Sequence, residues 1–203
     1  MSRLPARLLV VTDRHQACKP LPELVEELLD AGVRWIWLRD KNLPAEARRA
    51  LARDLAQRAA RYGATLTLGA DVALAAEVGA GVQLGAQDDV AAARQSLGRC
   101  ALIGVSAHSP AEIAAAQAAG ADYATLSPIF ASSSKPGYGP ALGLDALRAA
   151  SAAGLPILAL GGVTAGNARA CRAAGSAAVA VMGPMMRGGR QQAAELLLAL
   201  GDD

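Results

Sequence analysis

The feature that most constrains the fold is an eightfold alternation of short apolar runs with longer segments of helical spacing. The apolar runs are near-continuous, which is typical of parallel strands buried on both faces. We predict strands at residues 8–12, 34–38, 65–68, 81–84, 101–105, 122–126, 156–160 and 177–182. The segments between them predict helices over residues 21–30, 44–61, 88–97, 110–119, 144–153, 164–173 and 190–198, with one short helix at about 72–78.

One strand and one helix therefore recur roughly every 25 residues, and a closed eight-stranded barrel of this length sits at the lower size limit of its class. An open doubly wound sheet usually has fewer strands than this. We predict an α/β protein that forms a single (β/α)8 TIM barrel domain over residues 1–203. No linker or second domain interrupts the pattern.

A weak internal repeat supports this fold. Gly32, Gly79, Gly120 and Gly175 each follow a predicted helix and lead into the second, fourth, sixth and eighth strands. Glycine ends helices in this way because it adopts a positive φ without steric cost. The repeat therefore indicates one device for stopping a helix and starting a strand, used four times.

Composition excludes several classes of protein. Twenty Lys and Arg against eighteen Asp and Glu give a net charge of +2, without a block of like charges, so we expect neither nucleic-acid binding nor a polybasic membrane anchor. No apolar run approaches the ~20 residues that a membrane-spanning helix needs. The start, MSRLPARLLVVTD, does not have the pattern of a signal peptide. Three cysteines without a CxxC pair predict reduced thiols in a cytoplasmic protein: Cys18, Cys100 and Cys171.

In barrels of this kind the active site lies at the carboxyl ends of the strands. Gly161-Gly162 and Met182-Gly183 follow the seventh and eighth strands, where barrels commonly bind phosphate. Glycine lets backbone N–H groups approach the anion, and a helix start adds a favourable dipole. We therefore predict a phosphate site at these four residues, with simple tight turns as the alternative.

A second group of residues at the predicted rim combines cations with hydroxyl groups: Arg39, Lys41, Lys135, Ser106, Ser132 and Ser134. Converging cations and hydroxyl donors suit a diphosphate or a similar polyanion. The alternative interpretation is solvated loop charge, which is the usual state of Lys and Arg.

Histidines and aspartates complete the candidates at the rim. His108 follows the fifth strand and is either an acid–base group or a residue at a helix start, whereas we expect His15 to be exposed. Asp13, Asp71 and Asp88 are the carboxylates best placed to hold Mg²⁺, and Asp88 is alternatively a helix N-cap. The chain contains no HExxH motif and no His and Cys cluster of metal-binding type.

Several stretches at the strand ends then carry a family resemblance. They are residues 10–13 (VVTD), 32–41 (GVRWIWLRDK), 103–109 (IGVSAHS), 120–123 (GADY), 127–135 (SPIFASSSK) and 159–163 (ALGGV) with Asn167 behind it. Over nearly the whole chain these resemble the thiamine phosphate synthase family, which includes the TenI-type thiazole tautomerases. Its patterns read GVxxIQLRxK, GxSxHS, GADY…GPIFPTxTK and AIGGI.

The resemblance implies a cytoplasmic barrel of thiamine biosynthesis. Synthases of this family join a hydroxymethylpyrimidine diphosphate to a thiazole phosphate and release diphosphate. The pyrimidine C–O bond ionises first, so the reaction needs charge neutralisation on the leaving group rather than a general base. By position, the resemblance assigns Arg39, Lys41, Ser106, Ser132, Ser134 and Lys135 to the diphosphate, and Gly161, Gly162, Met182 and Gly183 to the thiazole phosphate. It also implies Mg²⁺, with Asp88 as the surviving ligand of two aspartates.

The sequence departs from the synthase pattern at two places and from the tautomerase pattern at a third. Trp37 replaces a glutamine that reads the pyrimidine, and Gly69-Ala70 replaces an Asn-Asp pair that contacts the pyrimidine and Mg²⁺. Asp71, one residue further on, is a candidate substitute ligand. Loss of that pair is seen in the tautomerase branch, but Pro128 stands where that branch carries a histidine, which leaves His108 as the nearby acid–base candidate.

Three functions therefore stay open from the sequence. The leading hypothesis is a transferase like thiamine phosphate synthase, with unchanged, reduced or altered activity. The second is a thiazole tautomerase that depends on His108. The third is a non-catalytic binder of thiazole phosphate or thiamine phosphate. In each case the expected partners are small phosphorylated molecules, and the apolar composition permits a homodimer.

Overall fold

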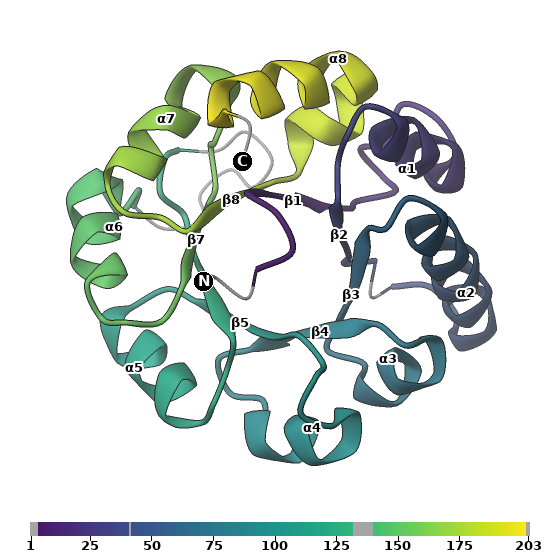
Figure 1. Ribbon diagram of the computed structural model, residues 1–203, viewed down its shortest axis with the longest axis horizontal. Helices are drawn as coiled ribbons and strands as arrows, with labels where there is room; N and C mark the ends of the chain where they lie inside the picture. Colours follow the sequence, from purple (N-terminus) through teal and green to yellow (C-terminus); the bar gives the residue numbers. More distant parts are fainter. Residues whose placement is uncertain (1–3, 41, 132–139, 202–203) are drawn as a thin grey trace.

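The computed structural model describes residues 4–40, 42–131 and 140–201, and its eight parallel strands form one closed barrel. The strands are β1 (Leu8–Val11), β2 (Trp35–Leu38), β3 (Thr65–Gly69), β4 (Gly81–Gly85), β5 (Ile103–Ala107), β6 (Tyr123–Leu126), β7 (Ile157–Leu160) and β8 (Ala178–Val181). The helices are α1 (Leu21–Asp30), α2 (Ala45–Arg61), α3 (Val72–Val78), α4 (Val90–Leu97), α5 (Pro110–Ala118), α6 (Gly143–Ser151), α7 (Ala165–Ala173) and α8 (Gly183–Leu200). The helices form a ring outside the strands (Figure 1), which confirms the predicted (β/α)8 barrel.

The glycine repeat behaves as predicted. The four glycines have positive φ values of 102°, 67°, 85° and 96° at Gly32, Gly79, Gly120 and Gly175. Each of them lies between the end of a helix and the next strand. The helix ends that lead into β2, β4, β6 and β8 therefore share a glycine with positive φ.

The predicted helix over residues 190–198 is the second half of α8. Helix α8 begins at Gly183 and is interrupted at Gly189, which has φ 47° and ψ −131°. The carboxylate of Glu27 on α1 accepts a hydrogen bond from the Arg190 backbone N–H at 2.8 Å. A Cβ at Gly189 would lie 2.5 Å from the same Glu27 oxygen. The break therefore lets a side chain of α1 cap the second half of α8. The glycines and the proline of the first half do not show a helical pattern in the sequence.

The core has two parts. Apolar residues on one face of each strand pack against the helices, while the other face fills the barrel with a smaller cluster that includes Trp35, Trp37 and Tyr123. Trp35 and Tyr123 meet edge to face across the barrel, with ring centroids 4.9 Å apart. Both polar ends have partners, since Trp35 Nε1–H donates to Thr67 Oγ1 at 2.9 Å and the Tyr123 hydroxyl donates to Gln83 Oε1 at 2.6 Å. Burial raises the pKa of Tyr123, so the ring stays neutral inside the barrel.

Gly104 makes room for this interior network. A Cβ at this position would lie 2.1 Å from a ring carbon of Tyr123 and 2.5 Å from Gln83 Oε1. Both distances are below 3.0 Å, so a Cβ atom at position 104 would force its neighbours to move. The absence of a side chain at Gly104 on β5 therefore allows the Tyr123–Gln83 hydrogen bond to form at the barrel centre.

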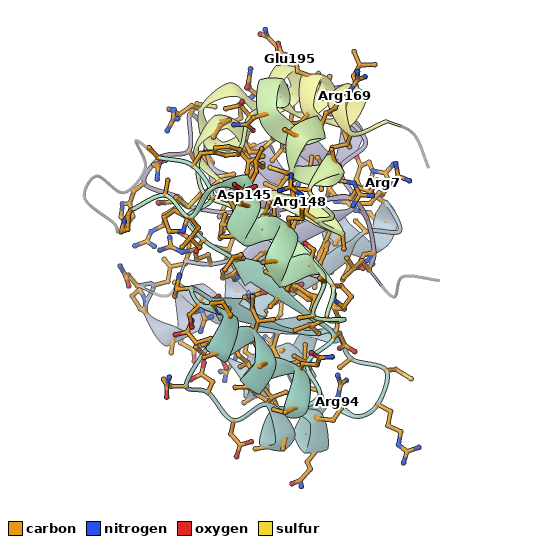
Figure 2. All side chains as sticks on the ribbon, turned by 90° about the vertical axis from the view of Figure 1, so that its left-hand side faces the viewer. Arg7, Arg94, Asp145, Arg148, Arg169 and Glu195 are labelled. Carbon is orange, nitrogen blue, oxygen red and sulfur yellow. The ribbon has the colours of Figure 1, made fainter. Side chains whose placement is uncertain are left out.

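Two arginines secure the end of α8 opposite to its capped break. Arg7 Nη1 donates to the Leu200 carbonyl at 3.3 Å, and Arg169 Nε donates to the Ala199 carbonyl at 3.0 Å (Figure 2). Arginines suit this place because the last carbonyls of a helix have no partner within the helix. None of the helices in the described ranges combines the length and the apolar character needed to cross a membrane.

Candidate functional site

The strand register determines which side chains meet at the mouth of the barrel. Layers of four side chains come from alternate strands in this fold, and the observed pairings define three such layers toward the carboxyl ends. The lowest contains Trp37, Gln83, Thr125 and Ala180. The middle one contains Val11, Gly69, Ser106 and Leu160, and the outermost contains Arg39, Gly85, Ser127 and Met182.

Arg39 extends across the outermost layer toward β8. Its Nη1 atom lies 3.9 Å from Met182 Sδ, and the side chains of both residues are half-buried. The residues predicted to bind diphosphate and those predicted to bind phosphate therefore come into direct contact at this point of the mouth.

A buried carboxylate holds the backbone beneath Arg39. Asp40 Oδ2 accepts from the Thr12 hydroxyl at 2.7 Å, and Asp40 Oδ1 accepts from the Arg14 backbone N–H at 2.9 Å. Thr12 Oγ1 in turn accepts from the Arg39 N–H at 3.1 Å. These bonds fasten the loop after β1 to the end of β2, and so they fix the position from which the Arg39 side chain extends.

Ser106 belongs to the barrel wall rather than to a loop. It is the fourth residue of β5, one residue beyond the predicted end of that strand, and it is half-buried. Gln83 Nε2 donates to its Oγ atom at 3.1 Å. The Ser106 hydroxyl is thus held one layer below Arg39 by a glutamine that is itself anchored to Tyr123.

His108 is exposed at the rim, with its ring held against the end of β6. Its Nδ1 atom lies 2.8 Å from the Ser127 carbonyl oxygen and 3.3 Å from Ser127 Oγ. A carbonyl oxygen only accepts, so this contact places the proton on Nδ1 and the lone pair of a neutral ring on Nε2. Ser109 is the N-cap of helix α5, so His108 lies at the start of this helix, directly before the cap, as one of its two predicted alternatives has it.

The glycine pair after β7 adopts a backbone that other residues take only with strain. Gly161 and Gly162 have φ values of 93° and 64°. Side chains here would also collide with the loop after β6, since a Cβ at Gly161 would lie 2.8 Å from Pro128 Cα and one at Gly162 would lie 2.5 Å from the Ala131 oxygen. Close packing between the two loops is by itself enough to require both glycines. This agrees with the alternative interpretation, in which these glycines serve a tight turn.

The same turn leads into helix α7 through a side-chain clasp. Asn167 Oδ1 accepts from the Thr164 N–H at 2.8 Å, and Asn167 Nδ2 donates to the Gly162 carbonyl at 3.0 Å. Met182 directly precedes the first turn of α8, and Gly183 is the first residue of that helix. Because β7 and β8 are neighbours in the sheet, the glycine pair and the start of α8 lie side by side at the mouth.

The three candidate carboxylates differ in how far other contacts occupy them. Asp13 accepts from the His15 N–H and from Gln16 Nε2. Asp71 caps helix α3 and pairs with Arg48 Nη1 at 2.6 Å, so it does not fit as a substitute metal ligand. Asp88 Oδ2 accepts from the Gly85 N–H at 2.7 Å. The N-cap of helix α4 is Asp89, so the alternative of Asp88 as the cap is wrong.

Asp88 is therefore the carboxylate that stays a candidate for Mg²⁺. In the part of the chain that the structure describes, no group of three or more His, Cys, Asp or Glu side chains gathers in one place. A protein cage for a cation is thus absent from these residues. The donor set fits Mg²⁺ in its other common mode, with one carboxylate and the oxygens of a bound phosphate group as ligands.

Four of the predicted site residues lie outside the described residues: Lys41, Ser132, Ser134 and Lys135. Of the remaining ones, the structure brings Arg39, Ser106 and Met182 to the mouth with the Gly161-Gly162 turn beside them. Sequence reasoning missed the roles of Thr12 and Asp40. Their signal is a hydroxyl residue and a carboxylate at the ends of two consecutive strands, which are neighbours in a parallel barrel.

Comparison with known proteins identifies the family. A family model described as thiamine monophosphate synthase matches residues 8–185. The chain belongs to this family. A putative thiamine-phosphate synthase from Geobacter sulfurreducens is 40% identical over 186 residues, which cover 90% of this chain and 87% of the relative. The thiamine-phosphate synthase from Geobacillus kaustophilus is 37% identical over 188 residues, which cover 89% of this chain and 85% of the relative.

A solved structure supports the same assignment within the thiamine monophosphate synthase family. The thiamine phosphate pyrophosphorylase from Pyrococcus furiosus superposes with a TM-score of 0.86 at 30% sequence identity. The match covers 98% of this chain and 96% of that one. The family resemblance drawn from the strand-end motifs is therefore confirmed.

Proposed function

We propose that this chain couples hydroxymethylpyrimidine diphosphate to thiazole phosphate and releases diphosphate. The C–O bond between the pyrimidine methylene and the diphosphate breaks, and its electron pair leaves with the diphosphate. The ring nitrogen of the thiazole phosphate then donates its lone pair to the methylene carbon and forms the C–N bond of thiamine phosphate. The observation that carries the proposal is the contact between Arg39 and Met182, which joins a cation to the predicted phosphate turn.

The proposed diphosphate end of the site uses Arg39 and the Ser106 hydroxyl. A fixed guanidinium stabilises the negative charge that develops on the leaving diphosphate, and it acts most strongly where water is excluded. Thr12 and Asp40 contribute by holding the Arg39 backbone, so the cation needs little reorganisation during the reaction. We assign Lys41, Ser132, Ser134 and Lys135 to the same diphosphate on the family motif.

The proposed thiazole phosphate end uses the Gly161-Gly162 turn and the start of helix α8 at Met182-Gly183. The two segments are adjacent through β7 and β8. The partial positive charge of a helix N-terminus favours a bound phosphate. The two substrates then meet over the middle layer of the mouth, between the turn and Arg39.

Mg²⁺ fits this site as a companion of the diphosphate. Asp88 would hold it together with the diphosphate oxygens, and the ion would supply further charge neutralisation for the leaving group. The three cysteines in the described chain are free thiols, and phosphorylated substrates of this kind are held inside cells, so we place the protein in the cytoplasm.

A thiazole tautomerase is the second candidate function, and the geometry of His108 favours it. With Nδ1–H directed at the Ser127 carbonyl, Nε2 carries the lone pair that could take a proton from a carbon beside the thiazole ring. Such a reaction would need neither the pyrimidine diphosphate nor Arg39.

Diphosphate release tests the proposal. Purified protein with Mg²⁺ should release diphosphate when both substrates are present, and far less when either one is omitted. His108→Ala should keep this activity. A loss of solvent-proton exchange into a carboxylated thiazole phosphate in His108→Ala, without any diphosphate release by the unaltered chain, would favour the tautomerase instead.

A further inference from the structure

Helix α8 is broken at Gly189, and it lies beside α1 in the ring of helices (Figure 1). In an unbroken helix the Arg190 N–H would donate to the Met186 carbonyl. Here the Arg190 N–H donates to Glu27 Oε1 at 2.8 Å instead. The Met186 carbonyl accepts from the Cys18 N–H at 3.0 Å. Both partners of the broken helical bond are therefore satisfied by α1 and by the loop that leads into it.

The Glu27 side chain is held at both of its carboxylate oxygens. Lys19, which follows Cys18 in the chain, donates from Nζ to Glu27 Oε2, while Oε1 accepts from the Arg190 N–H. Hydrogen bonds from Lys19 and then from Arg190 lower the pKa of Glu27, so its side chain is ionised at neutral pH. A carboxylate is favoured at the positive end of a helix dipole. Glu27 thus acts as a charged cap for the second half of α8, supplied by another helix.

The first half of α8 spans residues 183–188 and begins at the segment proposed to bind the thiazole phosphate. A helix this short is not stable through its own hydrogen bonds, so its position depends on contacts with the rest of the protein. The side chains of Met185 and Met186 are fully buried and anchor it in the core. The hydrogen bonds at Met186 and Arg190 hold the two sides of the break to α1 and its loop. The contacts at the break therefore help to set the orientation of the phosphate-binding start of the helix.

Gly189 is required for this arrangement in two ways. Its φ of 47° and ψ of −131° belong to a backbone conformation that favours glycine. A Cβ at this position would lie 2.5 Å from Glu27 Oε1 and 3.4 Å from Leu24 Cδ1. The missing side chain therefore gives the Glu27 carboxylate the room to reach the Arg190 N–H.

We propose that Glu27 is a positioning residue for thiazole phosphate, because it holds the break of α8 and thereby the orientation of residues 183–188. This inference rests on the proposed function and adds a residue of the outer helix ring to the same site. Without the carboxylate, the Arg190 N–H loses its partner, and the first half of α8 is free to tilt away from the neighbouring Gly161-Gly162 turn. Thiazole phosphate then has to restore the orientation when it binds, which lowers its affinity.

Calorimetric titration of thiazole phosphate into the full chain measures this effect without any turnover. Glu27→Ala should weaken the affinity about tenfold, within the range that a residue without ligand contact exerts through packed elements. Glu27→Asp keeps the charge but is one methylene too short for the Arg190 N–H, so it should weaken the affinity as well. Glu27→Gln keeps an acceptor oxygen at the same reach and should retain most of the affinity.

Two results of this titration would overturn the proposal. The first is an unchanged affinity in Glu27→Ala or, should that variant not fold, in Glu27→Asp. The second is a loss of affinity in Glu27→Gln as large as that in Glu27→Ala, because the hydrogen bond to Arg190 would then not be responsible.

Glu26 supplies the matched control on the same helix. Its side chain is 27% exposed, against 26% for Glu27, and it pairs with Arg58 on α2 at 2.6 Å. Glu26→Ala should therefore lower the thermal midpoint as Glu27→Ala does, and it should leave the affinity for thiazole phosphate unchanged. Equal losses of affinity in the two variants would show a general loosening of α1 and would overturn the specific role of Glu27.

Initial rates separate this inference from the synthase activity on which it rests. In Glu27→Ala, KM for thiazole phosphate should rise about tenfold, while kcat and KM for the pyrimidine diphosphate change little. Diphosphate release with an unchanged KM for thiazole phosphate would refute the inference and leave the proposed function intact. Weaker thiazole phosphate binding in Glu27→Ala, without diphosphate release by the unaltered chain, would refute the synthase activity and keep the positioning role. A lack of thiazole phosphate binding by the unaltered chain would overturn both.

Discussion

Arg39 on the end of β2 and Met182 on the end of β8 lie in contact, with Nη1 3.9 Å from Sδ, although 143 positions separate them in the chain. The contact crosses β1, the strand between them in the closed barrel. This contact places Arg39, the proposed cation for the diphosphate, beside the backbone segment proposed to bind the thiazole phosphate. A site that holds two phosphorylated substrates at once needs such a junction, because the reacting atoms must approach while both anions stay bound.

Removal of the Arg39 charge is expected to weaken the diphosphate substrate specifically. Arg39→Gln should raise KM for the pyrimidine diphosphate by about 10- to 100-fold, the range of one charge-assisted hydrogen bond, and should change KM for thiazole phosphate much less. Initial-rate kinetics with each substrate varied will measure this. Arg53→Gln is the matched control, because Arg53 pairs with Glu77 on the outer surface. Equal effects of the two variants would contradict the assignment of Arg39.

The Thr12–Asp40 hydrogen bond is expected to matter for both stability and rate. Thr12→Val leaves a buried carboxylate and the Arg39 N–H each short of one partner, so the free energy of unfolding should fall by about 1–3 kcal/mol. The value of kcat/KM should also fall, since the Arg39 backbone loses its anchor. Urea denaturation and initial rates measure the two effects. Thr12→Ser keeps the hydroxyl and should behave like the unaltered chain; a loss in Ser as large as in Val would argue that packing, not the hydrogen bond, is responsible.

The interior network predicts a strong effect of one methyl group. Gly104→Ala inserts a carbon into the space of the Tyr123 ring, and overpacking of this kind costs about 1–3 kcal/mol or more. Gly166→Ala on helix α7 is the control, since its Cβ would lie 3.7 Å from Thr164 Oγ1, an ordinary contact. That variant should be neutral or stabilised by about 0.5–1 kcal/mol. Thermal unfolding compares them, and equal midpoints would show that the barrel centre is looser than the structure indicates.

The junction between α1 and α8 should make stability depend on pH in the acid range. Hydrogen bonds from Lys19 and then from the Arg190 N–H lower the pKa of Glu27 from its ordinary value of 4.5. A carboxyl group with a lowered pKa in the folded state stabilises that state above its unfolded pKa, and the contribution is lost as the pH falls through the folded value. The stability difference between the unaltered chain and Glu27→Gln should therefore be full at pH 7 and shrink below about pH 4.5. Urea unfolding from pH 7 to pH 3 measures it, and a constant difference over this range would contradict the role of Glu27.

The fold was predictable from the sequence because parallel barrel strands are apolar on both faces and four of the helix ends carry a glycine. The exact ends of the strands were harder to predict. Ser106 was expected just after the fifth strand, yet β5 continues to Ala107, because the polar Ser106 faces the barrel mouth and so interrupts the apolar run that predicted the strand. The break at Gly189 depends on a capping carboxylate from Glu27, more than 160 positions away, which no local pattern reveals.

The candidate site also has a part that the sequence predicts and a part that it does not. Rim residues such as Arg39 and Met182 follow from their place after a strand, since the fold brings all strand ends together. Their mutual contact follows from the register around the closed barrel. Register is set by the packing of the whole interior, so it was beyond any reading of single strands.

The product of a single turnover tests the synthase activity most directly. Enzyme in excess over both substrates, with Mg²⁺, is quenched at intervals and analysed by mass spectrometry for thiamine phosphate and by coupled assay for diphosphate. Thiamine phosphate and diphosphate should appear together in equal amounts. Binding of both substrates at the same enzyme concentration, with no thiamine phosphate formed, would contradict the synthase activity.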